Sequence, residues 1–297
     1  MEAARPSHVA PLALSPRIAR STSPKPRSLI LDLFGEYLRF VDDEVPLGDL
    51  TTLLETFGVA PATVRVTMSR LRKEGWFNVR RDGRESRYRL TDTMRKLLDE
   101  GRARIFAAPP QEWNGKWTLV IYQLSESDRH DRDHLRKSLA WQGFGPLSTS
   151  TWLAPGDRRE TARGLVADLD AKHCEVLLCT SDGAAHDRSL AEQCWDLADL
   201  AAEYEEFIAE HQELLLRPGR LKGSDALVAR TTLIAHFRHF PFRDPHLPPQ
   251  LTPDSWPGDE AHALFRRAHE ALGPAARLFV GEILGREVVD AEIAEGR

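Results

Sequence analysis

The chain has 297 residues, of which 41% are hydrophobic and 29% are charged, and its formal net charge is −5. This composition is ordinary for a soluble globular protein, and the length suffices for two or three domains. No apolar run approaches the roughly 18–20 residues that cross a bilayer, which excludes a membrane-spanning protein. We also expect no secretory signal. Three cysteines without CxxC spacing favour a cytoplasmic protein without a disulfide framework: Cys174, Cys179 and Cys194.

Positive charge is concentrated in the first third of the chain. Residues 1–96 contain 17 Lys and Arg against 12 Asp and Glu, whereas residues 97–297 contain 23 against 33. The first part is therefore basic and the second acidic, which favours a nucleic-acid partner for the first. The alternative is that the arginines between residues 64 and 91 only form a solvated face.

Three short helices are expected near the N-terminus. Residues 1–26 are rich in Pro, Ser, Ala and Arg without periodicity, which predicts a disordered basic tail. Apolar residues at helical spacing predict helices over 28–40 and 47–58, and Gly58 is well placed to end the second in a left-handed conformation. A third helix is expected from Pro61, which suits a first turn, to Gly75.

A β-hairpin is expected after the third helix, because Asp82-Gly83 separates the strand-like runs 76–81 and 85–91. Three short helices and a hairpin are the order of a winged helix-turn-helix, which we assign to residues 27–92. The third helix would enter the major groove of DNA, although such a domain can also serve only protein contact. The expected DNA contacts lie on its outward face and near the hairpin tip: Arg65, Ser69, Arg70, Lys73, Arg81, Arg84 and Arg87.

The middle of the chain has an α/β pattern. Thr91 can cap a helix that leads out of the hairpin, and we assign residues 93–112 to this linker. The βαβαβ order that follows predicts a ferredoxin-like domain over 113–186, so the fold class is α+β with several domains. Its strands are expected at 116–124, 146–155 and 174–182, and its helices at 131–144 and 158–173.

Residues 187–297 are predicted to form a helical C-terminal domain for effector binding or dimerisation. One long helix over 187–217 carries apolar residues at alternating spacings of four and three, as in a coiled-coil seam. The seam either packs within the chain or forms a dimer interface, and both alternatives remain open. Further helices are expected at 224–240, capped by Ser224, and near 258–272 and 274–285.

Signatures of catalysis and of metal binding are absent from the sequence. No GxSxG, P-loop or GxGxxG motif occurs, and no histidine falls in HExxH spacing, so we expect no enzyme activity, no cofactor and no metal. The first strand of the middle domain ends in Tyr122-Gln123, without the carboxylate that a metal-dependent nuclease needs. A DNA-binding regulator with a different effector or none, and a metal-dependent nuclease, remain the alternatives.

Several blocks of the sequence resemble the PaaX-type repressors of phenylacetate degradation, from Arg27 to about Phe279. They include SLILDLFGEYLR, FGVAPATVRVTMSRLRKEGW, GRESRYRLT, WNGKWTLVIY and RDPHLPPQLTPDSWPG. The resemblance implies a winged-helix domain, a middle unit similar to CRISPR-associated ferredoxin-like nucleases, and a helical C-terminal domain. It also implies a homodimer that binds operator DNA and is released by an aryl-CoA thioester, typically phenylacetyl-CoA. In this family the positions Arg65, Ser69, Arg70 and Lys73 look like the DNA reader.

An acyl-CoA effector would need a particular kind of site. Its phosphates require Arg or Lys, and its aryl group requires an apolar slot. The candidate residues for this site are Trp141, Trp152, Arg238 and Arg243. The alternative is that these arginines pair with acids and the tryptophans fill a core.

Overall fold

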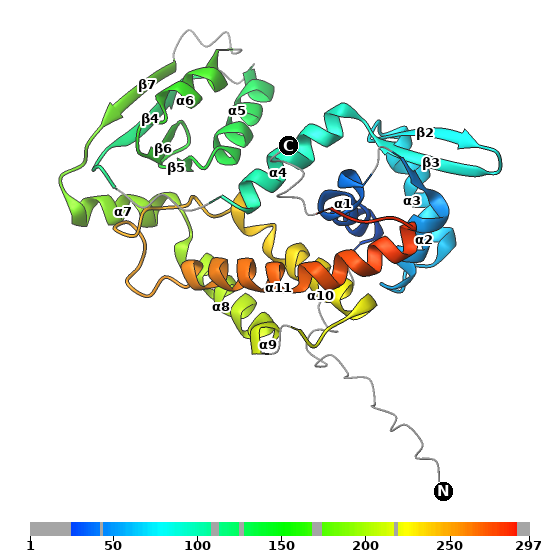
Figure 1. Ribbon diagram of the computed structural model, residues 1–297. Coiled ribbons are helices and arrows are strands. Elements are labelled where there is room, and N and C mark those ends of the chain that lie inside the picture. The colour runs from blue at the N-terminus through cyan, green and yellow to red at the C-terminus, as the bar shows by residue number, and fades with distance from the viewer. Residues whose placement is uncertain are drawn as a thin grey trace, which may run out of the picture.

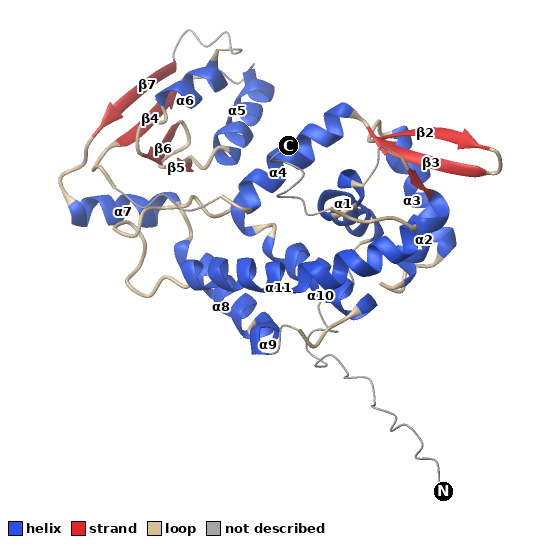
Figure 2. Cartoon of the chain, in the orientation of Figure 1, coloured by secondary structure: helices blue, strands red, loops and turns tan. Residues whose placement is uncertain are grey.

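The computed structural model describes residues 25–41, 44–107, 113–124, 128–167, 174–216 and 219–289. The chain folds into helices and two antiparallel sheets, which lie at opposite sides of the molecule (Figures 1 and 2). The predicted tail 1–26 falls outside the described residues except for Lys25 and Pro26, and Pro26 begins the first helix. Among the described residues no helix combines the length and apolar character needed to traverse a bilayer.

The N-terminal part consists of helices followed by a hairpin, as predicted. Gly58 and Gly83 both have positive φ, at 76° and 60°, and so make the turns that their positions indicated. The short strand β1 adds to the hairpin, giving a three-stranded sheet in the order β1-β3-β2. The elements are α1 (Pro26–Glu36), η1 (Leu38–Phe40), β1 (Val45–Pro46), α2 (Leu47–Glu55), α3 (Pro61–Lys73), β2 (Phe77–Asp82) and β3 (Glu85–Leu90).

The middle part is a four-stranded antiparallel sheet in the order β5-β6-β4-β7. The prediction of a single strand over 146–155 is wrong. The chain reverses after Pro146, and the amides of Leu147 and Ser148 both donate to Thr151 O, so two short paired strands form there. The element order is therefore β-α-β-β-α-β: β4 (Trp117–Tyr122), α5 (Arg129–Trp141), β5 (Gly145–Pro146), β6 (Thr151–Pro155), α6 (Arg159–Val166) and β7 (Cys174–Cys179).

Helices cover both faces of this sheet. Val120 and Tyr122 of β4 point to one face and pack with α5 and α6, through Leu139 and Ala162. Trp117 points to the other face and joins a cluster with α7 and the loop around Leu251. The predicted helix 158–173 ends earlier, at Val166, and residues 168–173 fall outside the described ranges.

The prediction of one long helix over 187–217 is wrong, because this segment forms three helices. The backbone leaves the helix at Trp195, which is extended at φ −136° and ψ 141°, and the Asp196 carboxylate then accepts from Asp199 N to cap the next helix. The indole of Trp195 stacks near Trp117 at 6.5 Å, and no Cβ would fit at Gly145, which packs against the break. The three helices are α7 (Ala184–Cys194), α8 (Leu197–His211) and α9 (Glu213–Leu216).

The apolar seam of α8 packs inside the chain. Among the residues at this spacing, Leu197, Tyr204 and His211 are buried. Tyr204 joins a core with Phe237 and Phe265 of the last two long helices, so packing within the chain accounts for this part of the seam. The remaining helices are α10 (Gly223–Phe237), η3 (Phe240–Phe242) and α11 (Gly258–Leu284).

Two further helix boundaries differ from those predicted. α10 begins at Gly223, so Ser224 lies in its first turn and does not cap it. α11 is one helix where two were predicted, because it runs through Pro274 without a break. Proline removes one backbone hydrogen bond, but the buried stripe of Ala268, Leu272 and Ala276 continues across it, and this packing outweighs the loss.

Three helices connect the three parts. α4 (Asp92–Ile105) is capped by Thr91, as predicted, and leads from the hairpin toward the middle sheet (Figure 1). α10 and α11 lie side by side and extend beneath the N-terminal helices, where Leu227 and Val280 join the same core as Leu33 and Met68. The N-terminal part is thus packed directly on the C-terminal helices.

Candidate functional site

The outward face of α3 is lined with basic and small polar side chains. Val64, Met68 and Leu71 are buried in the N-terminal core, which turns the opposite side of the helix to solvent. All four predicted contact residues of the helix are exposed there: Arg65, Ser69, Arg70 and Lys73. We call these four side chains the α3 face.

The hairpin tip presents two further arginines. Arg81 and Arg84 are exposed on either side of the Asp82-Gly83 turn. Among the described residues no acid forms an ion pair with either of them, or with Arg65, Arg70 or Lys73 of the α3 face. These five cations are therefore available for a polyanion.

Other arginines of the hairpin are engaged within the protein. Arg87 is half-buried and lies 3.4 Å from carboxylates of both Asp82 and Glu85. Arg80 donates from two nitrogens to the Glu44 carboxylate, at 2.9 and 2.7 Å. The structure thus separates Arg87 from the other predicted contacts, because it already has acidic partners.

A buried ion cluster fastens α1 to the rest of the molecule. The Glu36 carboxylate lies 2.8 Å from Arg102 of α4, 3.2 Å from Arg230 of α10 and 2.6 Å from His269 of α11. Burial disfavours the charged carboxylate, but His269 and the two guanidinium groups outweigh it and hold the pKa of Glu36 well below its usual value. We call these four residues the Glu36 cluster.

Asp32, one turn before Glu36, is held differently. Its Oδ1 forms an ion pair with Arg238 at 2.8 Å, whereas its buried Oδ2 has no hydrogen-bond partner among the described residues. Burial raises the pKa of Asp32 to about 7; Arg238 opposes this shift and Glu36 adds to it. Protonation of this carboxyl removes the cost of burying a charge that has only one ionic partner.

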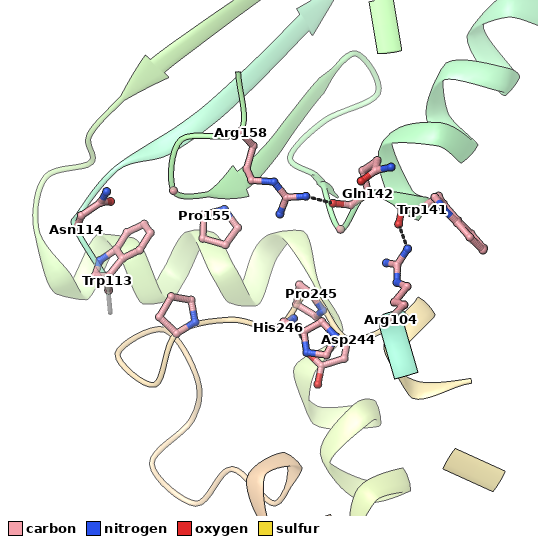
Figure 3. A pocket seen from close by; sticks show the side chains of 13 residues that line it. Arg104, Trp113, Asn114, Trp141, Gln142, Pro155, Arg158, Asp244, Pro245 and His246 are labelled. Atoms are coloured by element: carbon pink, nitrogen blue, oxygen red, sulfur yellow. Dashed lines mark hydrogen bonds between the residues drawn. The ribbon is translucent and has the colours of Figure 1, made fainter. Parts of the chain in front are cut away.

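A cavity of about 400 Å³ lies where the three parts of the chain meet (Figure 3). Arg104, at the end of α4, donates to the carbonyls of Pro241 and Trp141, and Arg158 donates to the carbonyl of Gln142. Within the described residues neither arginine forms an ion pair with an acid. Burial lowers the pKa of both guanidinium groups, and the charge of Arg158 adds to the effect on Arg104. We call this cavity the arginine pocket.

A second, apolar pocket of about 240 Å³ lies between α1, α4 and α10. Leu31, Leu98 and Ile234 line it, and its only described charged groups belong to Asp32, Glu36, Arg102 and Arg238. Trp141 lines both this pocket and the arginine pocket, and its ring stacks on Phe242 at 4.8 Å.

Of the four predicted effector residues, Trp141 and Arg238 line the apolar pocket together, and the other two lie elsewhere. Trp141 lies at the arginine pocket, but Trp152 is buried in the middle sheet with its indole N–H directed at Tyr122 Oη. Arg238 is held by Asp32, and Arg243 by Asp199 and Glu203. Two other arginines, Arg104 and Arg158, line the arginine pocket. They are 54 residues apart in the sequence and meet only in the fold, so no sequence motif could have indicated them.

Comparisons with known proteins match nearly the whole of the described chain. Three family models apply: PaaX-like protein at residues 25–94, PaaX protein central Cas2-like domain at 110–191, and PaaX-like protein C-terminal domain at 195–282. The transcriptional repressor PaaX of Escherichia coli K12 is 34% identical over 266 residues, which cover 86% of this chain and 83% of that protein. The chain belongs to the PaaX family.

A solved structure also shares the fold. The uncharacterized protein Rv0674 from Mycobacterium tuberculosis matches with a TM-score of 0.53 at 22% identity, covering 78% of this chain and 90% of that one. At this identity the likeness concerns the fold alone. The PaaX-family models also correspond to the break at Trp195, since the central model ends at 191 and the C-terminal model begins at 195.

Proposed function

We propose that this PaaX-family chain is a transcriptional repressor that binds double-stranded operator DNA through a winged helix-turn-helix. In this assignment α3 is the reading helix and the β2–β3 hairpin is the wing. The observation that carries the proposal is the set of exposed cations without acidic partners on the α3 face and at the hairpin tip. The named function of the E. coli relative supports it.

The helix and the hairpin would make different contacts with DNA. The 13-residue helix α3 is about 20 Å long, and its diameter of about 10–12 Å matches the width of a major groove, about 12 Å. Arg65, Ser69 and Arg70 project from it as donors for base edges, with Arg suited to guanine. Arg81 and Arg84 on the hairpin would then contact phosphates or the minor groove beside it.

Two copies of the chain would bind one operator. We infer a homodimer because a winged helix usually reads one half-site, and dimers read pseudo-palindromes whose spacing follows from the two-fold axis. The seam of α8 is buried within the chain, so the contact between copies would involve another surface. In this proposal the β-α-β-β-α-β middle part is the ferredoxin-like, Cas2-like unit of the family.

The effector we propose is an aryl-CoA thioester such as phenylacetyl-CoA. Arg104 and Arg158 supply charge without acidic partners for its phosphates, and the apolar pocket beside them can hold an aryl group. Trp141, which lines both pockets, would lie between the two ends of the ligand.

The position of these pockets offers a route from effector to DNA. The arginine pocket contains the last turn of α4, and the apolar pocket is bounded by α1 and α4. A ligand that binds there more tightly when α4 is displaced from α1 would shift the orientation of the winged domain and release the operator.

A binding experiment tests the two halves of the proposal separately. DNA fragments would be selected from a random library with the purified full-length chain, and affinity measured by fluorescence anisotropy with and without ligand. We expect a specific sequence to emerge and phenylacetyl-CoA, but not CoA or phenylacetate, to weaken its binding. Failure to select any sequence would refute the repressor function. Selection followed by unchanged affinity with every thioester would leave a DNA-binding protein with another effector or none.

A further inference from the structure

Two histidines and a glutamate converge between α8 and α10, away from both pockets described above. His211 Nε2 lies 3.0 Å from His236 Nδ1, Glu210 Oε2 lies 3.4 Å from the same Nδ1, and 4.0 Å separates Glu210 Oε2 from His211 Nε2. Glu210 and His211 are adjacent on α8, and His236 comes from the last turn of α10. All three are ligand types that transition metals accept.

The spacing of these atoms matches a coordination sphere. A triangle with sides of 3.0, 3.4 and 4.0 Å has a point about 2 Å from each corner. Zinc binds imidazole nitrogen at about 2.0–2.1 Å and carboxylate oxygen at about 2.0–2.2 Å. The three atoms can therefore contact one ion without moving either helix.

The surroundings of the cluster give an ion access to it. Glu210 and His236 line an open groove of about 450 Å³, whose other walls include Glu203, Glu206 and His239. An ion can reach the cluster through this acidic groove, and a water molecule there can supply a fourth ligand.

We propose that Glu210 Oε2, His211 Nε2 and His236 Nδ1 bind one divalent transition-metal ion of the Zn²⁺ type, with a fourth position open to the groove. In the metal-free chain the two imidazoles share a hydrogen bond. Metal binding uses the lone pairs of both facing nitrogens, so the proton between them moves to the other ring nitrogen or to water. The ion would tie the end of α8 to α10, one of the helices that carry the N-terminal part.

A second group of ligand types serves as an internal comparison. Asp244, His246 and His262 have ligand atoms within 4.8 Å of one another. There the hydroxyl of Tyr204 already donates to Asp244 Oδ2 at 2.7 Å and lies 3.4 Å from His262 Nε2. The phenol thus already engages two of the three residues, so we assign the metal to the α8–α10 cluster.

Metal titrations of the full-length chain test the assignment. Dialysed protein would be titrated with Zn²⁺ against a chromophoric chelator, and with Co²⁺ while its visible absorption is recorded. We expect one ion per chain, the absorption bands of a four-coordinate Co²⁺ site, and a higher melting temperature with Zn²⁺. His236→Gln and Glu210→Gln should each weaken binding by more than about tenfold.

Two variants locate the site. His239→Gln changes another histidine of the same groove, and His246→Gln changes the second cluster; both should bind Zn²⁺ like the unmodified chain. Circular dichroism without metal would establish that His236→Gln is folded, so that its loss of binding reports a lost ligand. Unchanged affinity in His236→Gln, loss in His246→Gln instead, or no binding by the unmodified chain would each overturn the proposal.

Discussion

The arginines on α3 and at the hairpin tip differ in exposure and in acidic partners from the arginines that pack against α1. Arg65, Arg70 and Arg84 are exposed, with no acidic partner among the described residues. Arg102 and Arg230 are buried around the Glu36 carboxylate. The positive charge counted in the sequence is therefore divided between outward cations, which a polyanion can reach, and inward cations, which hold the molecule together.

The inward set lies where the N-terminal part meets the rest of the chain. α1 places Leu29 and Leu33 in the N-terminal core, whereas Asp32 and Glu36 on its other side face α4, α10 and α11. With one apolar and one ionic contact surface, α1 connects the N-terminal part to the rest of the chain. Removing an inward charge should thus cost stability, and removing an outward one should cost DNA binding.

The largest expected effect comes from Glu36→Gln. Loss of the carboxylate leaves Arg230, Arg102 and His269 close together without their shared anion, and breaking a buried ion pair in this way costs about 3–5 kcal/mol. Urea denaturation followed by far-UV circular dichroism would measure the change in the free energy of unfolding.

Glu74→Gln is the matched control for that change, because Glu74 pairs with Arg27 at the surface. Its cost should stay below about 1 kcal/mol. Equal losses in the two variants would mean that the buried and exposed arginines do not differ as described.

The second effect concerns the outward set. Arg70→Ala should weaken binding to the selected operator by about 1–3 kcal/mol if the guanidinium contacts a base, with relaxed preference at one position of the site. Stability should be unchanged, because no described acid pairs with Arg70. Anisotropy titrations on operator and random DNA would separate base contact from phosphate contact, since the latter weakens both equally.

Arg159→Ala serves as its control. This arginine is paired with Asp157 at 2.7 Å in the middle part of the chain. Its removal should leave operator affinity unchanged, and a loss similar to that of Arg70→Ala would place the DNA surface elsewhere.

The third effect is a pH dependence of stability caused by Asp32. Burial raises the pKa of this carboxyl from 3.8 to about 7 in the folded chain. Between these two values the folded state keeps a proton that the unfolded state has released. The free energy of unfolding therefore falls as the pH rises from about 4 to 7, by up to about 1.4 kcal/mol per pH unit.

Asp32→Asn removes this dependence. The variant should gain stability relative to the unmodified chain as the pH rises from 4 to 7, and the difference should be constant above pH 8. Denaturation curves at several pH values would measure it. A difference of the opposite slope would show that Arg238 keeps Asp32 ionised in the folded state.

Local signals in the sequence were sufficient for the N-terminal elements. The cap at Thr91 and the positive φ of Gly58 and Gly83 depend on the residue and its immediate neighbours, so pattern alone predicts them. The break at Trp195 and the passage of α11 through Pro274 depend on partners distant in sequence. Helical spacing continues across both points and gives no sign of either outcome.

The candidate sites divide in the same way. Exposure of the α3 face follows from the periodicity of one helix, so its residues could be predicted from the sequence. The arginine pocket joins Arg104 to Arg158, and the proposed metal cluster joins His211 to His236, each pair from different elements. Spacing along the chain cannot reveal such sites, because only tertiary packing brings their residues together.

The smallest expected effect tests whether a surface arginine that is paired with an acid can be freed for DNA contact. Glu44 holds Arg80 on the hairpin through hydrogen bonds that also lower the pKa of this carboxyl, so Glu44 is ionised at neutral pH. Glu44→Gln should free Arg80 for a phosphate contact, because the other described acid near it, the exposed Asp82, is 3.8 Å away and holds it only weakly. The slope of log affinity against log salt concentration for random DNA should then steepen by about one. Asp157→Asn, which releases Arg159 far from the hairpin, should leave the slope as it was. A steeper slope in Asp157→Asn but not in Glu44→Gln would mean that partnership with an acid is not what keeps the hairpin arginine from DNA.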